Sequence, residues 1–467
     1  MPVVGQTQGG LSRRAVGYAL LAIIATAALL RIDAWLGTPV DTPLRADAAR
    51  YYAAAHNLRF NGVYSTDLAA LAGQRTPVPD AARNPGYPLF LMPFIGPVPT
   101  QSAVDRVVAA QVLISTSTVL FVYLLTARLL GRGWGLGAAL LTALSPHLIN
   151  ANIYLLTETL FAFLLVLFAY VLARLGEPPR RPLLMIAGGL LGGAALVHPS
   201  AQHFILPWLL LLWLARPRAL RWQATALALL GFALIFGPWV GRNLGVIGST
   251  GDDQPIINTI HHGLYPEFMY NGRPESFGYP YRYDPHSPEI AADLPSVFAE
   301  LYRRFTEEPW RHLHWFLVGK PIALWSWDTV QGAGDSFTYP VTDSPYYHHP
   351  GFQATHWLMR MLHWPLVTLG ALGALLAWLP QTSQRWSPVH RLALRSVSLL
   401  VLFLTLVHIV GAPFPRYGTP LRPLLYLLAM VAPALLFARQ KPTASSDQHV
   451  DWPAHMGSGH ADDRRLV

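Results

Sequence analysis

The sequence predicts an all-α polytopic membrane protein, and its composition and its apolar runs carry that prediction. Of the 467 residues, 52% are hydrophobic and only 13% are charged, about half the charged share of an average globular chain. Apolar runs of nearly membrane-spanning length recur along most of the chain. Cysteine is absent, which excludes disulfides, thiolate metal sites and cysteine catalysis.

Apolar runs of about 17–25 residues are the candidate spans. Ten spans are expected, with eleven to thirteen left open. They lie near residues 14–36, 105–128, 133–151, 155–175, 183–199, 201–215, 222–241, 356–379, 395–412 and 421–438. The apolar segment 314–328 is short and is interrupted by Lys320-Pro321, so we expect it to lie at the interface or to re-enter the membrane. The run 87–97 is likewise too short to span.

Short loops rich in arginine alternate with loops that carry no Arg or Lys. The positive-inside rule then places the amino terminus in the cytoplasm and the polar loops 37–104 and 242–355 outside a bacterial plasma membrane. The net charge of +9 fits such loops and requires no nucleic-acid partner. The tails 1–12 and 439–467 are polar, and we expect both to be disordered. The arginine-rich loops are 128–132, 174–181, 216–221, 385–395 and 439–441.

Polar groups that hydrophobic spans do not ordinarily need converge on the outer face. Structural polar groups would be divided between both faces, so the pattern predicts an outward-facing active site near the membrane surface. The groups are Asp47 and Arg83 in the first outer loop, Glu158 near the outer end of the fourth span, His198 at the next outer turn, Arg242 in "PWVGRN" and Arg416 in "PFPRYGTP".

Each of these side chains also has a plainer interpretation. In "DAARYYAAAHNL", helical spacing puts Asp47 and Tyr51 on one face of a helix lying along the membrane plane, and Asp47 could simply cap that helix. Arg83, in "RNPGYP", either snorkels to the headgroups or grips a phosphate with its planar fork. Glu158 is costly in hydrocarbon, which makes it a functional candidate by default.

Several other patterns point away from particular kinds of chemistry. Adjacent His261 and His262 without a spaced carboxylate are a poor metal signature. "GGLLGG" at 188–193 is typical of helix packing by small residues rather than of a phosphate loop. The sequence contains no P-loop, GxGxxG, HExxH or GxSxG motif, which disfavours nucleotide hydrolysis and serine or zinc hydrolases.

Five segments carry a family resemblance: "DAARY" from Asp47, "RNPGYPLF", "LLTETLF", "PWVGRN" and "PRYGTPLRPLL". In this order they resemble the motifs of GT-C glycosyltransferases, above all the bacterial family 39 group, which is related to protein O-mannosyltransferases and to the aminoarabinose transferase of lipid A. The resemblance extends over most of 14–438. It implies a GT-C helix bundle over 13–438. It also implies transfer of a sugar from a polyprenyl-phosphate carrier to an extracytoplasmic acceptor, which is a glycan, a lipid or a protein.

The resemblance assigns roles residue by residue. Asp47 matches the catalytic acid of the first loop, and Glu158 matches the carboxylate of the second. Arg83 stands where relatives hold a basic residue for the lipid phosphate. The remaining candidates are Arg242, Arg416 and His198 for the donor phosphate, and Tyr51, Tyr87, Asn243, Tyr417, His261 and His262 for substrate contacts.

The sequence departs from the family pattern at two positions. Ala48 stands where relatives often have a second acid, which weakens the case for a metal; a divalent cation, Mg²⁺ or Mn²⁺, at Asp47 and Glu158 is left open. His198 stands where an arginine commonly precedes the proline, which weakens the expected grip on the phosphate.

The expected chemistry agrees with these roles. A departing polyprenyl phosphate gains negative charge and needs cations. An acceptor hydroxyl needs a base, for which Asp47 is the candidate, and a single displacement would invert the anomeric configuration. A lipid-linked sugar flippase or transporter is an alternative, although transporters usually show repeated halves and polar residues at mid-membrane. A non-catalytic protein that binds lipid-linked sugar is another. The donor sugar and the acceptor are not readable from the sequence.

Overall fold

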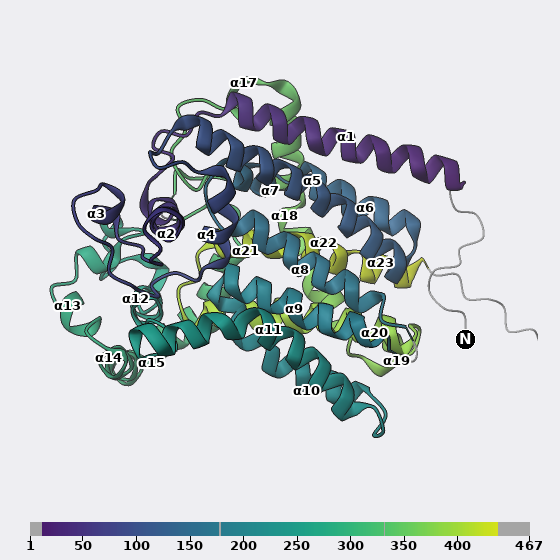
Figure 1. Ribbon diagram of the computed structural model, residues 1–467. Coiled ribbons are helices and arrows are strands. Elements are labelled where there is room, and N and C mark those ends of the chain that lie inside the picture. Colours follow the sequence, from purple (N-terminus) through teal and green to yellow (C-terminus); the bar gives the residue numbers. More distant parts are fainter. Residues whose placement is uncertain (1–11, 177–178, 331, 438–467) are drawn as a thin grey trace, which may run out of the picture.

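The computed structural model describes residues 12–437 apart from 177–178 and 331 (Figure 1). The predicted disordered tails lie, except for Ser12, outside the described residues. Within the described part the chain forms helices joined by turns, and its extended pairing is limited to two isolated bridges, Val40 with Val341 and Gly334 with Phe337. The predicted all-α class is confirmed.

The bundle is built from the long apolar helices. Six helices among the described residues are long and apolar enough to cross a membrane, and α8, α9 and α10 are shorter apolar helices beside them. A multi-pass membrane protein is therefore confirmed. The bundle comprises α1 (Arg13–Gly37), α5 (Gln101–Leu130), α6 (Arg132–Leu144), α8 (Glu158–Ala173), α9 (Arg181–Val197), α10 (Ile205–Ala215), α11 (Arg221–Ile247), α18 (Pro350–Leu376), α20 (Pro388–Val410), α22 (Arg422–Ala429) and α23 (Val431–Leu436).

Shorter helices form the loops at one end of the bundle. The first loop holds α2 (Ala46–Asn61), α3 (Leu68–Leu71), α4 (Gly86–Leu91) and the 3-10 turn Met92–Phe94. The second holds α12 (Gln254–Gly263), α13 (Ser287–Ile290), α14 (Leu294–Glu307), α15 (Pro309–His314), the π turn Trp315–Gly319, α16 (Lys320–Leu324), α17 (Pro345–His348) and the 3-10 turns Pro266–Phe268, Pro274–Ser276 and Pro280–Arg282. Elsewhere lie α7 (Pro146–Asn150), α19 (Pro380–Ser383), α21 (Pro415–Gly418) and the 3-10 turns Ala151–Ile153, Pro199–Phe204 and Thr419–Leu421.

Several predicted boundaries were wrong. Helix α11 continues to Ile247, so "PWVGRN" lies inside the helix and the second loop starts near 248 rather than 242. Helix α18 begins at Pro350, before the predicted start of its span at 356. Helix α20 begins at Pro388, so part of the predicted loop 385–395 is helical. The predicted run 133–151 breaks at Ser145-Pro146, because proline has no backbone N–H to continue the ladder.

Small residues bring α9 and α11 together. A Cβ on Gly188 would lie 1.9 Å from the carbonyl oxygen of Ala228, and one on Gly231 would lie 2.0 Å from that of Met185. The two backbones therefore touch only because these positions carry no side chain. The predicted packing role of the glycine-rich segment is confirmed, and this contact fixes the end of α9 that leads to His198.

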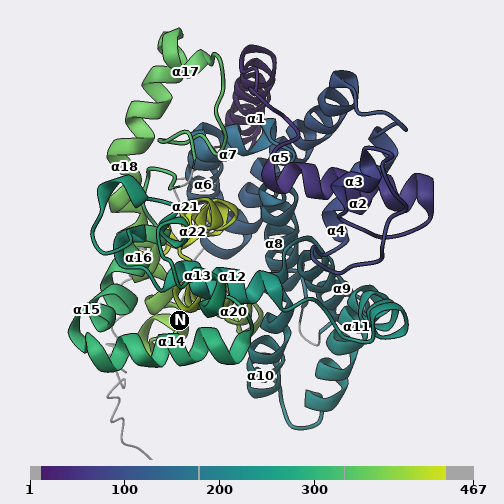
Figure 2. The ribbon, with the colours of Figure 1, turned by 90° about the vertical axis from the view of Figure 1, so that its left-hand side faces the viewer.

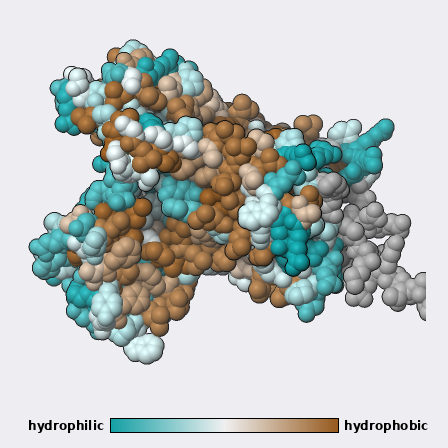
Figure 3. Space-filling model, turned by 60° about the horizontal axis from the view of Figure 1, so that its bottom comes forward, coloured by the Kyte–Doolittle hydropathy of each residue, from teal (hydrophilic) through white to brown (hydrophobic). Residues whose placement is uncertain are grey.

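The two loop regions gather at one end of the bundle, at the left of Figure 1, while the described chain begins at the right. Figure 2 looks onto that end: the first-loop helices α2, α3 and α4 lie on the right, and α14, α15 and α16 of the second loop lie on the lower left. In Figure 3 hydrophobic side chains gather over the middle of the molecule and hydrophilic ones toward both ends. This is the surface expected of a bundle that crosses a lipid layer.

The segment predicted to be interfacial or re-entrant, 314–328, is helical only as far as Leu324. The Nζ of Lys320 at its centre donates to the carbonyls of Ile409 (2.8 Å) and Gly411 (2.9 Å), where α20 ends at the side of the loops. The segment thus packs against the end of the bundle, and it is not among the six candidate spans.

Candidate functional site

Asp47 is the second residue of α2. The cap position of this helix is Arg45, whose side chain makes no capping hydrogen bond, so the alternative in which Asp47 caps the helix is wrong. The preceding residue, Ala46, has a φ of 48°, a left-handed conformation that is strained for a residue with a Cβ. Such strain concentrates at functional sites, where the surrounding structure holds it in place.

Both carboxylate oxygens of Asp47 are occupied by guanidiniums. Arg83 donates from Nη2 to Oδ1 at 2.8 Å, and Arg416 donates from Nη2 to Oδ2 at 2.5 Å. The three side chains are each between 22% and 24% exposed, so the group is largely buried but still accessible to solvent. Burial by itself raises the pKa of Asp47, but the charges and hydrogen bonds of Arg416 and Arg83 outweigh it and hold that pKa well below its usual range.

The turn that carries Arg83 is fixed against α9. The Asn84 side-chain amide donates to the carbonyl of Ala195 at 2.8 Å, and the Tyr64 hydroxyl donates to the carbonyl of Arg83 at 2.8 Å. A Cβ on Gly86 would lie 2.6 Å from the carbonyl carbon of Leu196. The glycine of "RNPGYP" is therefore required by a close approach of two backbones, and this contact places Arg83 next to α2.

Arg416 reaches the same acid from the other end of the sequence. It lies in α21, directly after the turn that follows α20, and its guanidinium also lies over the Tyr417 ring, 5.2 Å from the centroid. The turn begins at Gly411, whose carbonyl accepts from Lys320. The buried Nζ of Lys320 thus satisfies carbonyls that the end of α20 leaves unpaired and fixes the start of the segment that carries Arg416.

Glu158 and His198 lie within reach of these charges. Glu158 is 7% exposed and starts α8, where a helix amino terminus favours an anion; Arg416 and Asp47 both act on it electrostatically. Among the described residues it has no ion-pair partner. Burial, with the charge of Arg416, lowers the pKa of His198 to about 4, so this imidazole is neutral at pH 7. Its Nδ1 lies 2.7 Å from the Ser200 hydroxyl and 3.4 Å from the Ser200 backbone nitrogen.

Aromatic side chains line the group. Tyr51 lies edge-on to Tyr87, with ring centroids 5.2 Å apart, and the charges of Asp47, Arg83 and Arg416 all act on its phenol. The Tyr87 hydroxyl donates to Gln111 at 2.9 Å and is fully buried, which is the environment of a packing residue. Tyr417 lies edge-on to His198, at 5.9 Å.

Arg242 holds the first loop in place, and the neighbouring Asn243 accepts a hydrogen bond from it. Arg242 donates to the backbone carbonyls of Asp80 (2.7 Å) and Tyr64 (3.0 Å) and to the side-chain oxygen of Asn243 (2.9 Å). Asn243 is fully buried and donates to the carbonyl of Thr250. Arg242 therefore contacts the loop that presents Arg83, whereas Asn243 contacts Arg242 and Thr250; these hydrogen bonds do not lead to the carboxylate of Asp47.

His261 and His262 belong to a separate cluster in the second loop. His261 Nε2 lies 2.9 Å from the Tyr265 hydroxyl, which donates to Asp284 at 2.7 Å. His262 Nε2 lies 3.1 Å from the carbonyl of Gly278. Both histidines are buried, and a cavity of about 690 Å³ bordered by Tyr265 and Asp284 opens beside them. The structure does not bring them to Asp47.

The residues around Asp47 do not fit a divalent cation. Two arginines occupy the two oxygens that would bind it, and the described part of the chain contains no group of three or more His, Asp or Glu residues that could hold a metal. The guanidiniums instead supply the positive charge that faces this carboxylate.

The sequence reasoning missed two side chains of the group. Tyr339 comes from the second loop, and the charges of Arg416, Asp47 and Glu158 act on its phenol. His408, in α20, stacks on the Tyr417 ring with centroids 4.7 Å apart. His408 could have been found by the rule that picked Glu158, because it is an ionisable residue near the end of an apolar helix, at the side of the loops. Tyr339 has no comparable signal.

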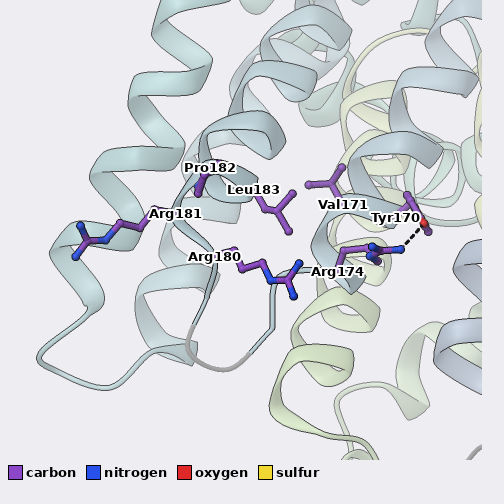
Figure 4. A pocket seen from close by; sticks show the side chains of 7 residues that line it. All are labelled: Tyr170, Val171, Arg174, Arg180, Arg181, Pro182 and Leu183. Atoms are coloured by element: carbon purple, nitrogen blue, oxygen red, sulfur yellow. Dashed lines mark hydrogen bonds between the residues drawn. The ribbon is translucent and has the colours of Figure 1, made fainter.

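A second basic group lies at the opposite end of the bundle, where α8 ends and α9 begins (Figure 4). Arg174, Arg180 and Arg181 border a pocket there, together with Tyr170, whose hydroxyl accepts from Arg174 at 3.0 Å. These arginines thus lie at the other end of α8 from Glu158.

One segment of the sequence matches a known family model. Residues 100–241 match the family model described as dolichyl-phosphate-mannose-protein mannosyltransferase. The match covers less than a third of the chain and is what this segment is similar to. It includes Glu158 and His198, whereas Asp47, Arg83 and Arg416 lie outside the matched range. No curated protein sequence matches the chain.

Solved structures of similar shape were found at low identity. The archaeal oligosaccharyltransferase AglB from Archaeoglobus fulgidus, in complex with an inhibitory peptide and a dolichol-phosphate, is 15% identical, with a TM-score of 0.48 over 88% of this chain and 50% of that one. ArnT from Cupriavidus metallidurans, bound to undecaprenyl phosphate, is 13% identical, with a TM-score of 0.47 over 90% of this chain and 60% of that one. The chain spans about half the length of AglB and 60% of the length of ArnT.

Proposed function

We propose that this protein is a glycosyltransferase of the GT-C type in the bacterial plasma membrane. It transfers a sugar from a polyprenyl-phosphate carrier to an acceptor hydroxyl on the outer side. The family description supports a lipid-phosphate sugar donor, because dolichyl phosphate is itself a polyprenyl phosphate. The acceptor class, whether glycan, lipid or protein, is left open.

One observation carries the proposal: a carboxylate between two arginines that come from opposite ends of the sequence. Asp47 and Arg416 are 369 residues apart and Asp47 and Arg83 are 36 apart, yet the fold joins all three at one end of the bundle. A purely structural acid on α2 would need one local partner. Transfer of a sugar from a lipid phosphate instead requires a base for the acceptor hydroxyl and cations for the phosphate, and this group offers both.

The reaction then follows from the chemistry of the parts. The acceptor oxygen attacks the anomeric carbon, the bond from that carbon to the phosphate oxygen breaks, and polyprenyl phosphate departs with the bonding pair. Asp47 takes the proton of the acceptor hydroxyl. Arg83 and Arg416 stabilise the charge that grows on the phosphate, and the neutral His198 adds an N–H donor. A single displacement inverts the anomeric configuration, and Glu158 orients the acceptor.

A deletion strain gives the direct test. Loss of the enzyme should make the lipid-linked sugar accumulate, and mass spectrometry of extracted lipids would then identify the donor. Purified protein should convert that donor to polyprenyl phosphate. A strain without accumulation, together with purified protein that binds the donor but never turns it over, would favour the non-catalytic alternative; movement of the intact donor across a vesicle would favour the flippase.

The outward position of the site has its own test. Reporter domains fused after residues 180 and 390 should lie in the cytoplasm, and one inserted near residue 280 should lie outside. A cytoplasmic signal from residue 280 would place the Asp47 group on the wrong side for an extracytoplasmic acceptor.

A further inference from the structure

The carboxylate of Asp47 is held by the same two guanidiniums that the proposed function assigns to the donor phosphate. A carboxylate and a phosphate each offer a pair of oxygens to an arginine fork, and both form charge-assisted hydrogen bonds with it. Arg83 and Arg416 are each bonded to one oxygen of Asp47. Two anions therefore compete for one pair of cations.

We propose that, before the donor binds, the carboxylate of Asp47 occupies the positions on Arg83 and Arg416 that the donor phosphate will take. The lipid phosphate then displaces Asp47 from the two arginines, and this displacement frees Asp47 to act as the base. The proposal rests on the proposed function and adds a coupling between donor binding and base activation. The observed ion pairs are then the resting state. The enzyme has no competent base until a donor has entered.

The bonding of Asp47 explains why such a step is needed. A general base works best when its pKa lies near the working pH, and a carboxylate with both oxygens bonded to guanidiniums is far from that condition. Removing the two cations raises the pKa of Asp47 and frees its lone pairs for the acceptor hydroxyl. The partial exposure of all three side chains leaves room for an anion to enter between them.

The exchange of Asp47 for the donor phosphate on the two arginines is also reversed at the end of each turnover. As Asp47 takes the proton of the acceptor it becomes neutral and loses its attraction to the arginines, while the departing phosphate gains charge and attracts them more strongly. Both changes favour the transition state over the bound substrate, as catalysis requires. When Asp47 later gives its proton to water, it competes for Arg83 and Arg416 again and promotes release of polyprenyl phosphate.

A simpler explanation has to be separated from this one, since any negative charge near the site repels a phosphate. Repulsion acts through space and does not depend on a particular arginine. Displacement does, because Asp47 and the phosphate use the same guanidinium. The two explanations therefore differ in whether the effect of removing the Asp47 charge depends on Arg83.

The test is a double-mutant cycle on the full chain in lipid nanodiscs, with undecaprenyl phosphate as the probe. Asp47→Asn should bind this lipid about 10-fold more tightly than wild type, the scale of one charged hydrogen bond. In the Arg83→Gln background the same change should gain about threefold or less. An equal gain in both backgrounds would leave repulsion alone, and no gain in either would remove the competition. If wild type neither binds the lipid nor transfers sugar, the proposed function itself fails.

Glu158→Gln is the matched control, because it removes an equal charge from the same neighbourhood at a residue without an ion pair among the described residues. Its effect on lipid affinity should be smaller than that of Asp47→Asn and should be the same with and without Arg83→Gln. A Glu158→Gln gain that depends on Arg83 would overturn the specific role of Asp47. Thermal unfolding of each variant confirms that it is folded, and Asp47→Ser replaces Asp47→Asn in the cycle if the latter does not accumulate.

Discussion

Two polar clusters at the loop end of the bundle use nearly the same residue types. The site cluster joins Asp47 to Arg83 and Arg416 with His198 and Glu158 nearby. The loop cluster consists of Asp284, Arg304, Tyr265 and His261: the Tyr265 hydroxyl donates to Asp284 at 2.7 Å, and Arg304 donates to Asp284 at 3.4 Å while lying 4.5 Å over the Tyr265 ring. Composition alone does not tell these clusters apart.

The bonds that join the members of each cluster distinguish the two clusters. Every member of the loop cluster comes from within one loop and is bonded to another member, so the cluster is complete without a ligand. The site cluster draws its cations from distant segments, contains a buried Glu158 without an ion pair among the described residues, and follows a strained Ala46. A cluster with unused bonding capacity can serve a substrate, whereas a completed one stabilises the fold.

The largest expected effect comes from Asp47→Asn. Asn keeps the shape of the side chain but cannot take a proton, so sugar transfer should fall about 10²- to 10⁴-fold while the protein still accumulates in the membrane. The measurement is transfer from a lipid-linked sugar by purified protein. The control is Asp284→Asn, which changes the loop cluster in the same way. Active, normally folded Asp47→Asn protein would remove the difference between the clusters.

Arg83 should show the next largest effect. Arg83→Ala removes a charged hydrogen bond worth about 1.5–3 kcal/mol, which corresponds to a defect of about 10- to 150-fold in use of the lipid donor. Arg83→Lys keeps the charge and loses only the planar fork, so its defect should be smaller. Steady-state kinetics with varied donor concentration measure both. Donor dependence unchanged in the alanine variant would mean that Arg83 does not contact the phosphate.

Asp284→Asn should change stability rather than activity. Asp284 is buried and accepts from Tyr265 and Arg304, so its loss should cost about 1.5–3 kcal/mol of unfolding free energy. Transfer by the folded protein should stay within about threefold of wild type. Thermal unfolding in detergent and the transfer assay test the two halves; a large activity loss at normal stability would turn the loop cluster into part of the site.

The smallest effect concerns pH. An unfolded histidine has a pKa near 6.5, and burial with the charge of Arg416 lowers the pKa of His198 to about 4. Below pH 6.5 the unfolded chain binds a proton that the folded chain excludes, so stability is lost as the pH falls. From pH 7 to 5.5 the loss is about 1 kcal/mol. His198→Gln should lose less over this range, and an equal loss in both proteins would contradict a neutral, buried His198.

The sequence alone determined the class of this protein and most of its candidate site. Apolar runs fixed the bundle because hydrocarbon accepts only backbones whose hydrogen bonds are satisfied within a helix. Ionisable residues in or next to the apolar runs marked Asp47, Glu158 and Arg416, because charge in a membrane is too costly to keep without a use. The helix boundaries were less exact, since α11 and α20 continue through polar and proline-containing segments that read as loops.

Only the tertiary structure decided which of these residues meet. Arg242 and Arg83 look alike in the sequence, yet Arg242 is bonded to loop carbonyls and Arg83 to Asp47. The adjacent histidines 261 and 262 looked like substrate contacts but pack inside the second loop, and Tyr339 joins the group without any local signal. Partner choice depends on how segments tens or hundreds of residues apart are packed, through contacts such as Gly188 on Ala228. A one-dimensional pattern does not contain those distances.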